Sequence, residues 1–111
     1  MTTLSTHVLD TMHGRPAAGM ALALSGPNGE IARGTTNKDG RCPDLAPADL
    51  APGRYAIRFL VADYFRAQGV ALPDPPFLDE VTVNFGIAGD GGHYHVPLLV
   101  SPYGYSTYRG S

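Results

Sequence analysis

The last nineteen residues of the chain, 93–111, place titratable, cationic and aromatic side chains in two apolar, β-prone segments. His93 and His95 alternate with core-type residues, and Tyr108 and Arg109 lie close to the end of the sequence. An imidazole, with an ordinary pKa of about 6.5, can accept or donate a proton at neutral pH. Phenol and guanidinium groups can hold and polarise substrate oxygens. This stretch therefore predicts a site for acid–base chemistry.

Side-chain alternation divides the strand expected at 93–100 into two faces. His93 and His95 lie on one face. The other face is apolar and belongs to the core, with Tyr94, Val96, Leu98 and Val100. The first and last strands of the chain show the same division into an apolar side and a mixed side.

If the mixed sides of these three strands lie in one sheet, they form a common outer surface. The polar groups on this surface are His7, His95, Ser106 and Tyr108, and the apolar residues beside them are Leu9, Pro97 and Leu99. Such a surface is too apolar to remain in contact with water. We therefore predict self-association through it, with a lined cleft or channel at the interface of a symmetric oligomer.

The rest of the chain is divided by 14 Gly and 10 Pro into short segments that alternate or favour β-branched and aromatic residues. This pattern predicts an all-β fold, a two-sheet antiparallel sandwich of seven to eight strands. The expected strands are 4–9, 20–25, 30–36, 54–61, 78–84, 93–100 and 105–109. The turn residues Pro27, Asn28 and Gly29 predict a hairpin between the second and third strands. One short helix is expected at 62–69, where a glycine can cap its end.

Length, charge and cysteine content restrict the function. With 111 residues, the chain is expected to form a single domain, 1–111, with one core. Its net charge of −2 provides no basic surface for nucleic acid or an anionic membrane. No apolar run approaches the roughly 18 residues of a membrane span, and the N-terminus lacks a signal-peptide pattern. Because Cys42 is the single cysteine and cannot form an internal disulfide, we expect a cytoplasmic protein. From the charge and the lack of a long apolar run, we expect no nucleic-acid or membrane partner.

Two other kinds of site have weaker support in the sequence. His93 and His95 share a face and His7 could add a third zinc ligand, but no carboxylate or thiol stands at a matching position. We expect neither a metal nor another cofactor in the reaction. Cys42 has no neighbouring histidine to activate it, and no Gly-x-Ser-x-Gly elbow supports a serine nucleophile.

Five segments carry a more specific signal. They are Thr6-His-Val-Leu-Asp10, Gly14-Arg-Pro-Ala-Ala-Gly19, Thr36-Asn-Lys-Asp-Gly-Arg41, His93-Tyr-His-Val-Pro-Leu-Leu99 and Ser101-Pro-Tyr-Gly-Tyr-Ser-Thr-Tyr-Arg-Gly-Ser111. Together they resemble the transthyretin-like 5-hydroxyisourate hydrolase family, and the resemblance spans nearly the whole chain. The closing Tyr108-Arg-Gly-Ser111 matches the signature of the enzymes in that family, which the hormone carriers of the same fold do not have.

The resemblance implies a transthyretin-like (prealbumin) sandwich of eight strands and a homotetramer, a dimer of dimers with its sites in a central channel. The implied substrate is the small molecule 5-hydroxyisourate, the product of urate oxidation. Its ring amide would be hydrolysed to 2-oxo-4-hydroxy-4-carboxy-5-ureidoimidazoline. By residue matching, the catalytic positions are His7, Arg41, His95 and Ser111, and the substrate-binding positions are His7, Arg41 and Tyr108.

The expected mechanism is attack of water on the ring carbonyl. Either His7 or His95 takes the proton from the water, while Arg41 and Tyr108 hold and polarise the substrate oxygens. Which histidine is the base stays open at this point, because their tautomers depend on partners that the sequence pattern does not identify. We also expect the carboxylate of Ser111 to pair with Arg41.

Two other functional classes stay open. A small-molecule carrier on the same fold would bind its ligand in the central channel, but Tyr108 and the residues after it should narrow that channel. A structural sandwich module would explain the strands and turns equally well. Such a module would not require His7, Arg41 and His95 together, so the sequence favours the enzyme.

Overall fold

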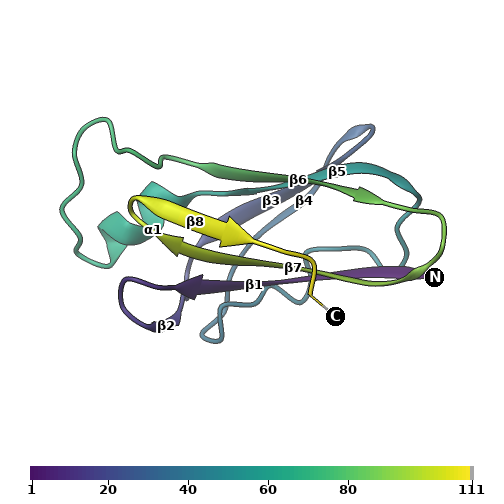
Figure 1. Cartoon of the computed structure of the whole chain (residues 1–111), viewed down its shortest axis with the longest axis horizontal. Coiled ribbons are helices and arrows are strands. Elements are labelled where there is room, and N and C mark those ends of the chain that lie inside the picture. Colours follow the sequence, from purple (N-terminus) through teal and green to yellow (C-terminus); the bar gives the residue numbers. More distant parts are fainter. Residues whose placement is uncertain (111) are drawn as a thin grey trace.

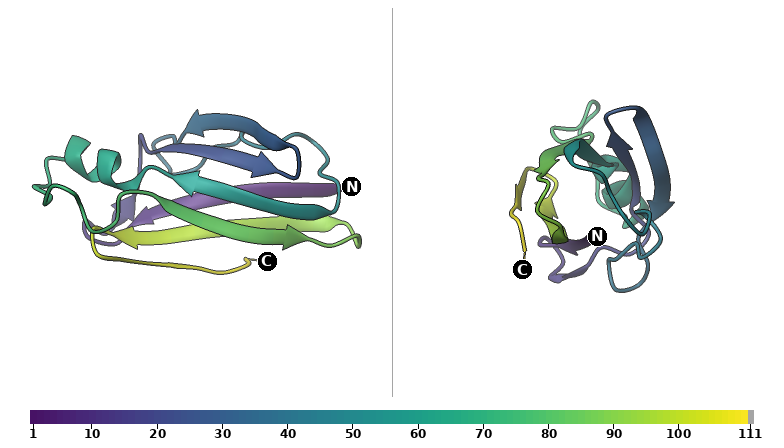
Figure 2. Two further views of the ribbon diagram at one scale, coloured as in Figure 1. Left: turned by 90° about the horizontal axis from the view of Figure 1, so that it is seen from above. Right: turned by 90° about the vertical axis from the view of Figure 1, so that its right-hand side faces the viewer.

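The computed structural model describes residues 1–110 and consists of two layers of β-sheet with a short helix at one end (Figure 1). One sheet has the strand order β2-β1-β7-β8 and the other has the order β4-β3-β5-β6. The elements are β1 (Thr2–Asp10), β2 (Arg15–Pro16), β3 (Ala21–Gly26), β4 (Gly29–Thr35), β5 (Gly53–Phe59), α1 (Val61–Ala67), β6 (Val81–Ile87), β7 (Gly92–Ser101) and β8 (Gly104–Thr107). The right-hand view of Figure 2 looks along the strands and shows the two layers. The predicted two-sheet sandwich with one short helix is confirmed.

The expected antiparallel pairing is wrong for one pair of strands. β1 and β7 run parallel, in a register that begins with Thr2 beside Gly92 and ends with Asp10 beside Val100. Parallel neighbours need a long connection, and here the whole second sheet and α1 lie between the two strands in the chain. No turn motif marks such a pairing, so the local pattern could not predict it.

Element boundaries also differ from the expected ones. The helix begins at Val61, so β5 stops at Phe59 and does not reach residue 61. β6 begins at Val81, where its pairing with Phe59 begins, and not at residue 78. The two-residue β2 is too short to show any periodicity and was not expected. The predicted hairpin is confirmed, because β3 and β4 pair from Gly26 beside Gly29 onward.

The core lies between the two sheets. The four inward residues predicted for β7 are all buried: Tyr94, Val96, Leu98 and Val100. On β1, Thr6 and Val8 are buried on the same side. Burial of a valine or leucine side chain contributes about 1.5 to 3 kcal/mol to folding stability. The buried residues therefore fix which face of β1 and β7 points outward. In the part of the chain that the structure describes, no helix is long and apolar enough to cross a membrane.

A buried carboxylate connects the helix to the first strand. Asp10 is 1% exposed and accepts hydrogen bonds from the His13 backbone N–H at 2.9 Å, from His13 Nδ1 at 2.6 Å and from the Tyr64 hydroxyl at 2.7 Å. Burial by itself would raise the pKa of Asp10, but the hydrogen bonds from His13 and Tyr64 outweigh it and hold the pKa below its ordinary value. Burial and the hydrogen bond to Asp10 raise the pKa of Tyr64 to about 12. Leu60 gives α1 no side-chain cap, so this network anchors the helix.

Candidate active site

The outer face of the β1–β7 pair carries both predicted histidines. The parallel register places Ser5 beside His95 and His7 beside Pro97. His7 and His95 are therefore diagonal neighbours on adjacent strands, a spacing at which long or aromatic side chains interact. Since the opposite face of both strands is buried in the core, the two imidazoles project away from the sandwich.

A turn at residues 37–40 brings Arg41 to the same place. Asn37 Oδ1 accepts hydrogen bonds from the N–H groups of Asp39 and Arg41, and Arg41 forms an antiparallel bridge with His7. Gly40 has a φ of 75°, and its carbonyl accepts the Val8 N–H at 2.8 Å. A Cβ at Gly40 would collide with the Val8 carbonyl oxygen. Glycine is therefore required where the turn packs on β1, and this packing sets Arg41 next to the histidines.

The same turn determines which ring nitrogen of His7 carries a proton. His7 Nε2 lies 2.8 Å from the carbonyl oxygen of Asp39. A carbonyl oxygen can only accept, so Nε2 carries a proton. In the neutral ring, Nδ1 is then the unprotonated nitrogen.

His95 has the features of a general base. Its Nδ1 lies 2.7 Å from Ser5 Oγ, which leaves Nε2 for water or substrate. Partial burial lowers the pKa of His95, and the positive charges of Arg41, His7 and His93 lower it further. The ring is therefore neutral at neutral pH, as acceptance of a proton requires.

The C-terminal segment passes beside His95. The Gly110 N–H donates to the His95 carbonyl oxygen at 2.8 Å. This bridge continues the register in which β8 pairs Thr107 with Leu98. Ser111, predicted as a catalytic residue, lies outside the described residues.

Tyr108 falls opposite Pro97 in that register, on the face that also carries His7. Tyr108 is 59% exposed and also borders a groove of about 200 Å³ beside β6. Within residues 1–110 no hydrogen bond joins it to His7 or Arg41. The structure therefore places Tyr108 on the predicted surface, one strand away from the group formed by His7, Arg41 and His95.

Arg109 also holds the terminal segment against β7. Its guanidinium carbon lies 3.8 Å from the centroid of the Tyr94 ring, and Nη2 donates to the His93 carbonyl oxygen at 3.4 Å. A cation over an aromatic face is stabilising. Arg109 thus packs against the strand that carries His95.

The outer surface of the β1–β7 pair exposes less apolar area than expected. Pro97 is buried within one chain, and Leu9 and Leu99 are half-buried. The large exposed aromatic side chains lie elsewhere, on the α1–β6 loop, the β7–β8 hairpin and the segment after it: Phe77, Tyr103, Tyr105 and Tyr108. Phe77 and Tyr103 also contact each other, with ring centroids 6.0 Å apart.

Several hollows border the sheets outside the core. One of them, of about 170 Å³, lies next to Arg41 and is lined in part by Ser5 and Cys42. Burial, with the negative charge of Asp44, raises the pKa of the Cys42 thiol, so it is not an activated nucleophile. The residues that line this hollow do not include His7 or His95, and within residues 1–110 both histidines keep part of their surface exposed.

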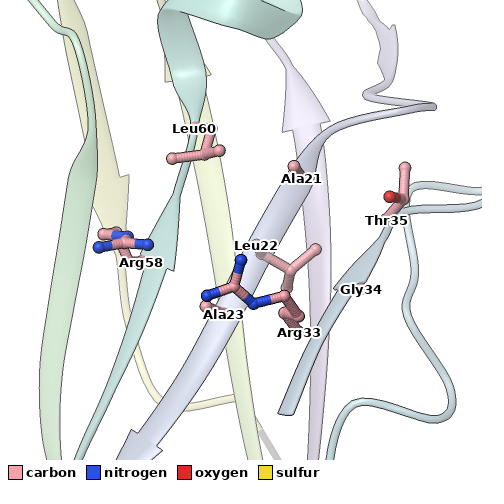
Figure 3. Close-up of a pocket in the computed structure, with 8 residues that line it drawn as sticks. All are labelled: Ala21, Leu22, Ala23, Arg33, Gly34, Thr35, Arg58 and Leu60. Atoms are coloured by element: carbon pink, nitrogen blue, oxygen red, sulfur yellow. The ribbon is translucent and has the colours of Figure 1, made fainter. Parts of the chain in front are cut away.

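Another hollow, of about 240 Å³, lies on the outer face of the other sheet between Arg33 and Arg58 (Figure 3). Both guanidiniums already have acidic partners, since Arg33 contacts Glu30 at 2.7 Å and Arg58 contacts Glu80 at 3.6 Å. The residues that line this hollow include no group for acid–base catalysis near neutral pH.

Two contributors to the site, Ser5 and Gly110, were not predicted from the sequence. Ser5 lies within hydrogen-bond distance of both His95 and His93, which was expected on this face, and Gly110 packs against the His95 ring. Ser5 could have been found from its place on the same face as His7, but its partner depends on the parallel register. Among residues 1–110 no three His, Cys, Asp or Glu side chains form a group that could hold a metal ion, so His93, His95 and His7 do not make a zinc site within one chain.

Comparison with known proteins identifies the family to which the chain belongs. Residues 4–110 match the model of the HIUase/Transthyretin family. A 5-hydroxyisourate hydrolase from Pseudomonas aeruginosa is 54% identical, and the alignment covers 97% of this chain and 90% of that protein.

Solved structures show the same fold. The 5-hydroxyisourate hydrolase of Klebsiella pneumoniae is 38% identical with a TM-score of 0.85, over 98% of this chain and 99% of that one. A sea bream transthyretin in complex with thyroxine is 31% identical with a TM-score of 0.85, over 96% and 93% of the two chains. An (S)-allantoin synthase is 39% identical with a TM-score of 0.91 over 99% of this chain, which spans only 44% of that protein.

Proposed function

Since the chain belongs to the HIUase/Transthyretin family, we propose that it hydrolyses 5-hydroxyisourate to 2-oxo-4-hydroxy-4-carboxy-5-ureidoimidazoline in the breakdown of urate. The observation that carries this proposal is the group formed by His7, Arg41 and His95 on one outer face, with an imidazole of lowered pKa beside a guanidinium. Such a group suits hydrolysis of a ring amide, because it offers both a base for water and a positive charge for a carbonyl oxygen.

The reaction follows from the protonation of the two histidines. His95 Nε2 takes a proton from water as the water oxygen bonds to the ring carbonyl carbon. Arg41 offsets the negative charge that develops on the carbonyl oxygen. The carbon–nitrogen bond then breaks, and the proton passes from His95 to the leaving ring nitrogen. Acid–base catalysis of this kind contributes about 10²- to 10⁴-fold in rate.

His7 is better suited to orientation than to the first proton transfer. The Asp39 carbonyl holds the proton on its Nε2, so its free Nδ1 can accept a hydrogen bond from substrate or water. Tyr108 would contact the substrate from the neighbouring strand, and Ser111 is kept as a proposed catalytic residue. We assign the base to His95 because its own hydrogen bond leaves Nε2 directed away from β1.

We further propose that the protein acts as a cytoplasmic homotetramer, a dimer of dimers. The face with His7 and His95 is open in one chain, and a substrate bound there would stay in contact with bulk water. A second copy placed over this face would complete a channel and cover the exposed Tyr108. The single cysteine, Cys42, agrees with a reducing compartment.

A carrier function is the alternative, and the sea bream match shows that fold similarity does not separate the two. A carrier needs no base of lowered pKa. The deciding experiment follows the ultraviolet decay of freshly generated 5-hydroxyisourate with and without the protein, in buffer that contains a chelator. We expect faster decay with the wild-type protein, and much less acceleration with His95→Ala. Decay at the uncatalysed rate, with substrate retained on the protein, would instead support a carrier.

A further inference from the structure

A line of hydrogen bonds leads to His95 along the outer face of β1 and β7. Thr3 Oγ1 lies 2.6 Å from His93 Nδ1, and His93 Nε2 lies 2.9 Å from Ser5 Oγ. Ser5 Oγ lies in turn 2.7 Å from His95 Nδ1. The parallel register creates this line, because Thr3 pairs with His93 and Ser5 pairs with His95.

Proton counting allows only two arrangements of this line when both rings are neutral. The Ser5 hydroxyl has one proton, so it donates to one of the two imidazole nitrogens beside it and accepts from the other. If Ser5 donates to His93, then His95 Nδ1 carries a proton and His95 Nε2 is bare. If Ser5 donates to His95, then His93 Nε2 carries the proton and His95 holds its own proton on Nε2. Thr3 satisfies either arrangement, since a hydroxyl both donates and accepts.

We propose that Ser5 and His93 are positioning residues that set the tautomer of His95 and so determine whether its Nε2 can act as a base. This inference rests on the proposed function for its catalytic consequence, but the tautomer is a property of the free protein. In the arrangement that supports catalysis, His93 donates to Thr3 through Nδ1–H and accepts from Ser5 through Nε2. Ser5 then accepts from His95 Nδ1–H, and it keeps that role when His95 Nε2 takes the proton from water.

In the other arrangement, His95 cannot act as the base. A doubly protonated His93 must donate through Nε2–H to Ser5, which forces Ser5 to donate to His95 Nδ1. The neutral His95 then carries its proton on Nε2 and cannot accept one from water. His93 is exposed to solvent. Among residues 1–110, the other charged or titratable groups around His95 and His93 are Arg41 from the 37–41 turn, His7 from β1 and Arg109 from the terminal segment.

The first test reads the tautomer directly by nitrogen NMR of ¹⁵N-histidine-labelled protein without substrate. In the wild type at pH 8, we expect a protonated Nδ1 and an unprotonated Nε2 for His95. Ser5→Ala should lose this preference, and Ser5→Thr, which keeps a hydroxyl, should retain it. Ser25→Ala, in β3 of the other sheet, is the matched control and should leave the His95 signals unchanged. A His95 tautomer that is the same in the wild type and Ser5→Ala would overturn the proposal.

The second test uses kinetics. Ser5→Ala should lower kcat by about tenfold, with little change in KM, because supporting partners of a functional histidine typically contribute 10- to 100-fold. His93→Gln places a side-chain amide, which does not protonate, beside Ser5, so the acid limb of its kcat–pH profile should move to lower pH. An acid limb at the wild-type position would show that His93 does not control His95. If the wild type has no hydrolase activity, the proposed function fails, and the NMR result still decides the tautomer.

Discussion

The Gly110 N–H donates a hydrogen bond to the His95 carbonyl oxygen at 2.8 Å, and the His95 ring fills the space that a side chain at position 110 would need. A Cβ at position 110 would lie 2.6 Å from His95 Cδ2, closer than real side chains approach. Gly110 is therefore the residue that lets the terminal segment lie directly against the ring that we assign as the base. A larger residue must displace either the segment or the imidazole.

We predict that Gly110→Ala lowers kcat by about 10- to 100-fold, because a displacement of about 1 Å at a catalytic group has effects of this size. Thermal stability should change little, since residues 108–110 are not part of the core. The matched control is Gly89→Ala, where a Cβ would meet only Pro52 Cγ at an ordinary 3.7 Å. Steady-state kinetics and melting curves of both variants check the prediction. Equal kcat values for the two variants would contradict it.

The four histidines of the chain should separate into functional and structural groups. His7→Ala and His95→Ala are each expected to lower kcat by about 10²- to 10⁴-fold with near wild-type melting temperatures, since both rings lie outside the core. His13→Ala should do the reverse, because it removes the hydrogen bond between the His13 ring and buried Asp10 and keeps only the one from the backbone N–H. Kinetics and thermal unfolding on the same samples make the comparison. A wild-type rate in either of the first two variants would remove that histidine from the mechanism.

The outward direction of His7 and His95 could be predicted from the sequence, because alternation along a strand is a local property. The hairpin at Pro27–Gly29 could be predicted for the same reason, from the residues of the turn itself. The partners of the histidines could not. Ser5 meets His95 across 90 positions of sequence, and a shift of one residue in the β1–β7 register would exchange every contact on that face.

Arg41 shows where similarity to a family adds to physical reasoning. From the sequence alone, a residue after Asp39-Gly40 is most simply a solvated turn residue. Its place beside His7 depends on the close packing of Gly40 on the Val8 carbonyl, which no local pattern encodes. The apolar outer surface was predicted at Pro97, but that proline is covered within one chain. The terminal segment that covers it pairs by backbone register, which side-chain types do not determine.

Stability should fall in acid through Asp10. Its pKa is lowered in the folded protein, so its contribution is complete above the unfolded value of about 4 and is lost as the pH falls through the folded pKa. Tyr64→Phe removes one of the hydrogen bonds to this carboxylate and should cost about 1 to 3 kcal/mol at neutral pH. The same change raises the folded pKa toward the unfolded one, so the variant loses less stability on acidification. Urea unfolding from pH 7 to pH 3 should show the two stability curves converging, whereas parallel curves would show that Asp10 and Tyr64 are not coupled.

The last prediction concerns assembly. Tyr108 is 59% exposed and lies on the face with His7, and Tyr103 is 63% exposed in the turn between β7 and β8. Exposed aromatic groups of this kind are enriched in protein interfaces, and a partner chain placed here would exclude water from the base. We therefore expect light scattering to give a tetramer, and specific activity to fall on dilution at the concentration where the tetramer dissociates. Ser106→Arg places a bulky charge on the face with His7, because Ser106 pairs with the outward Leu99, and it should move both transitions to higher concentration together. Ile31→Arg, at an exposed position of the other sheet, should move neither. A monomer with full specific activity would show that one chain completes the site by itself.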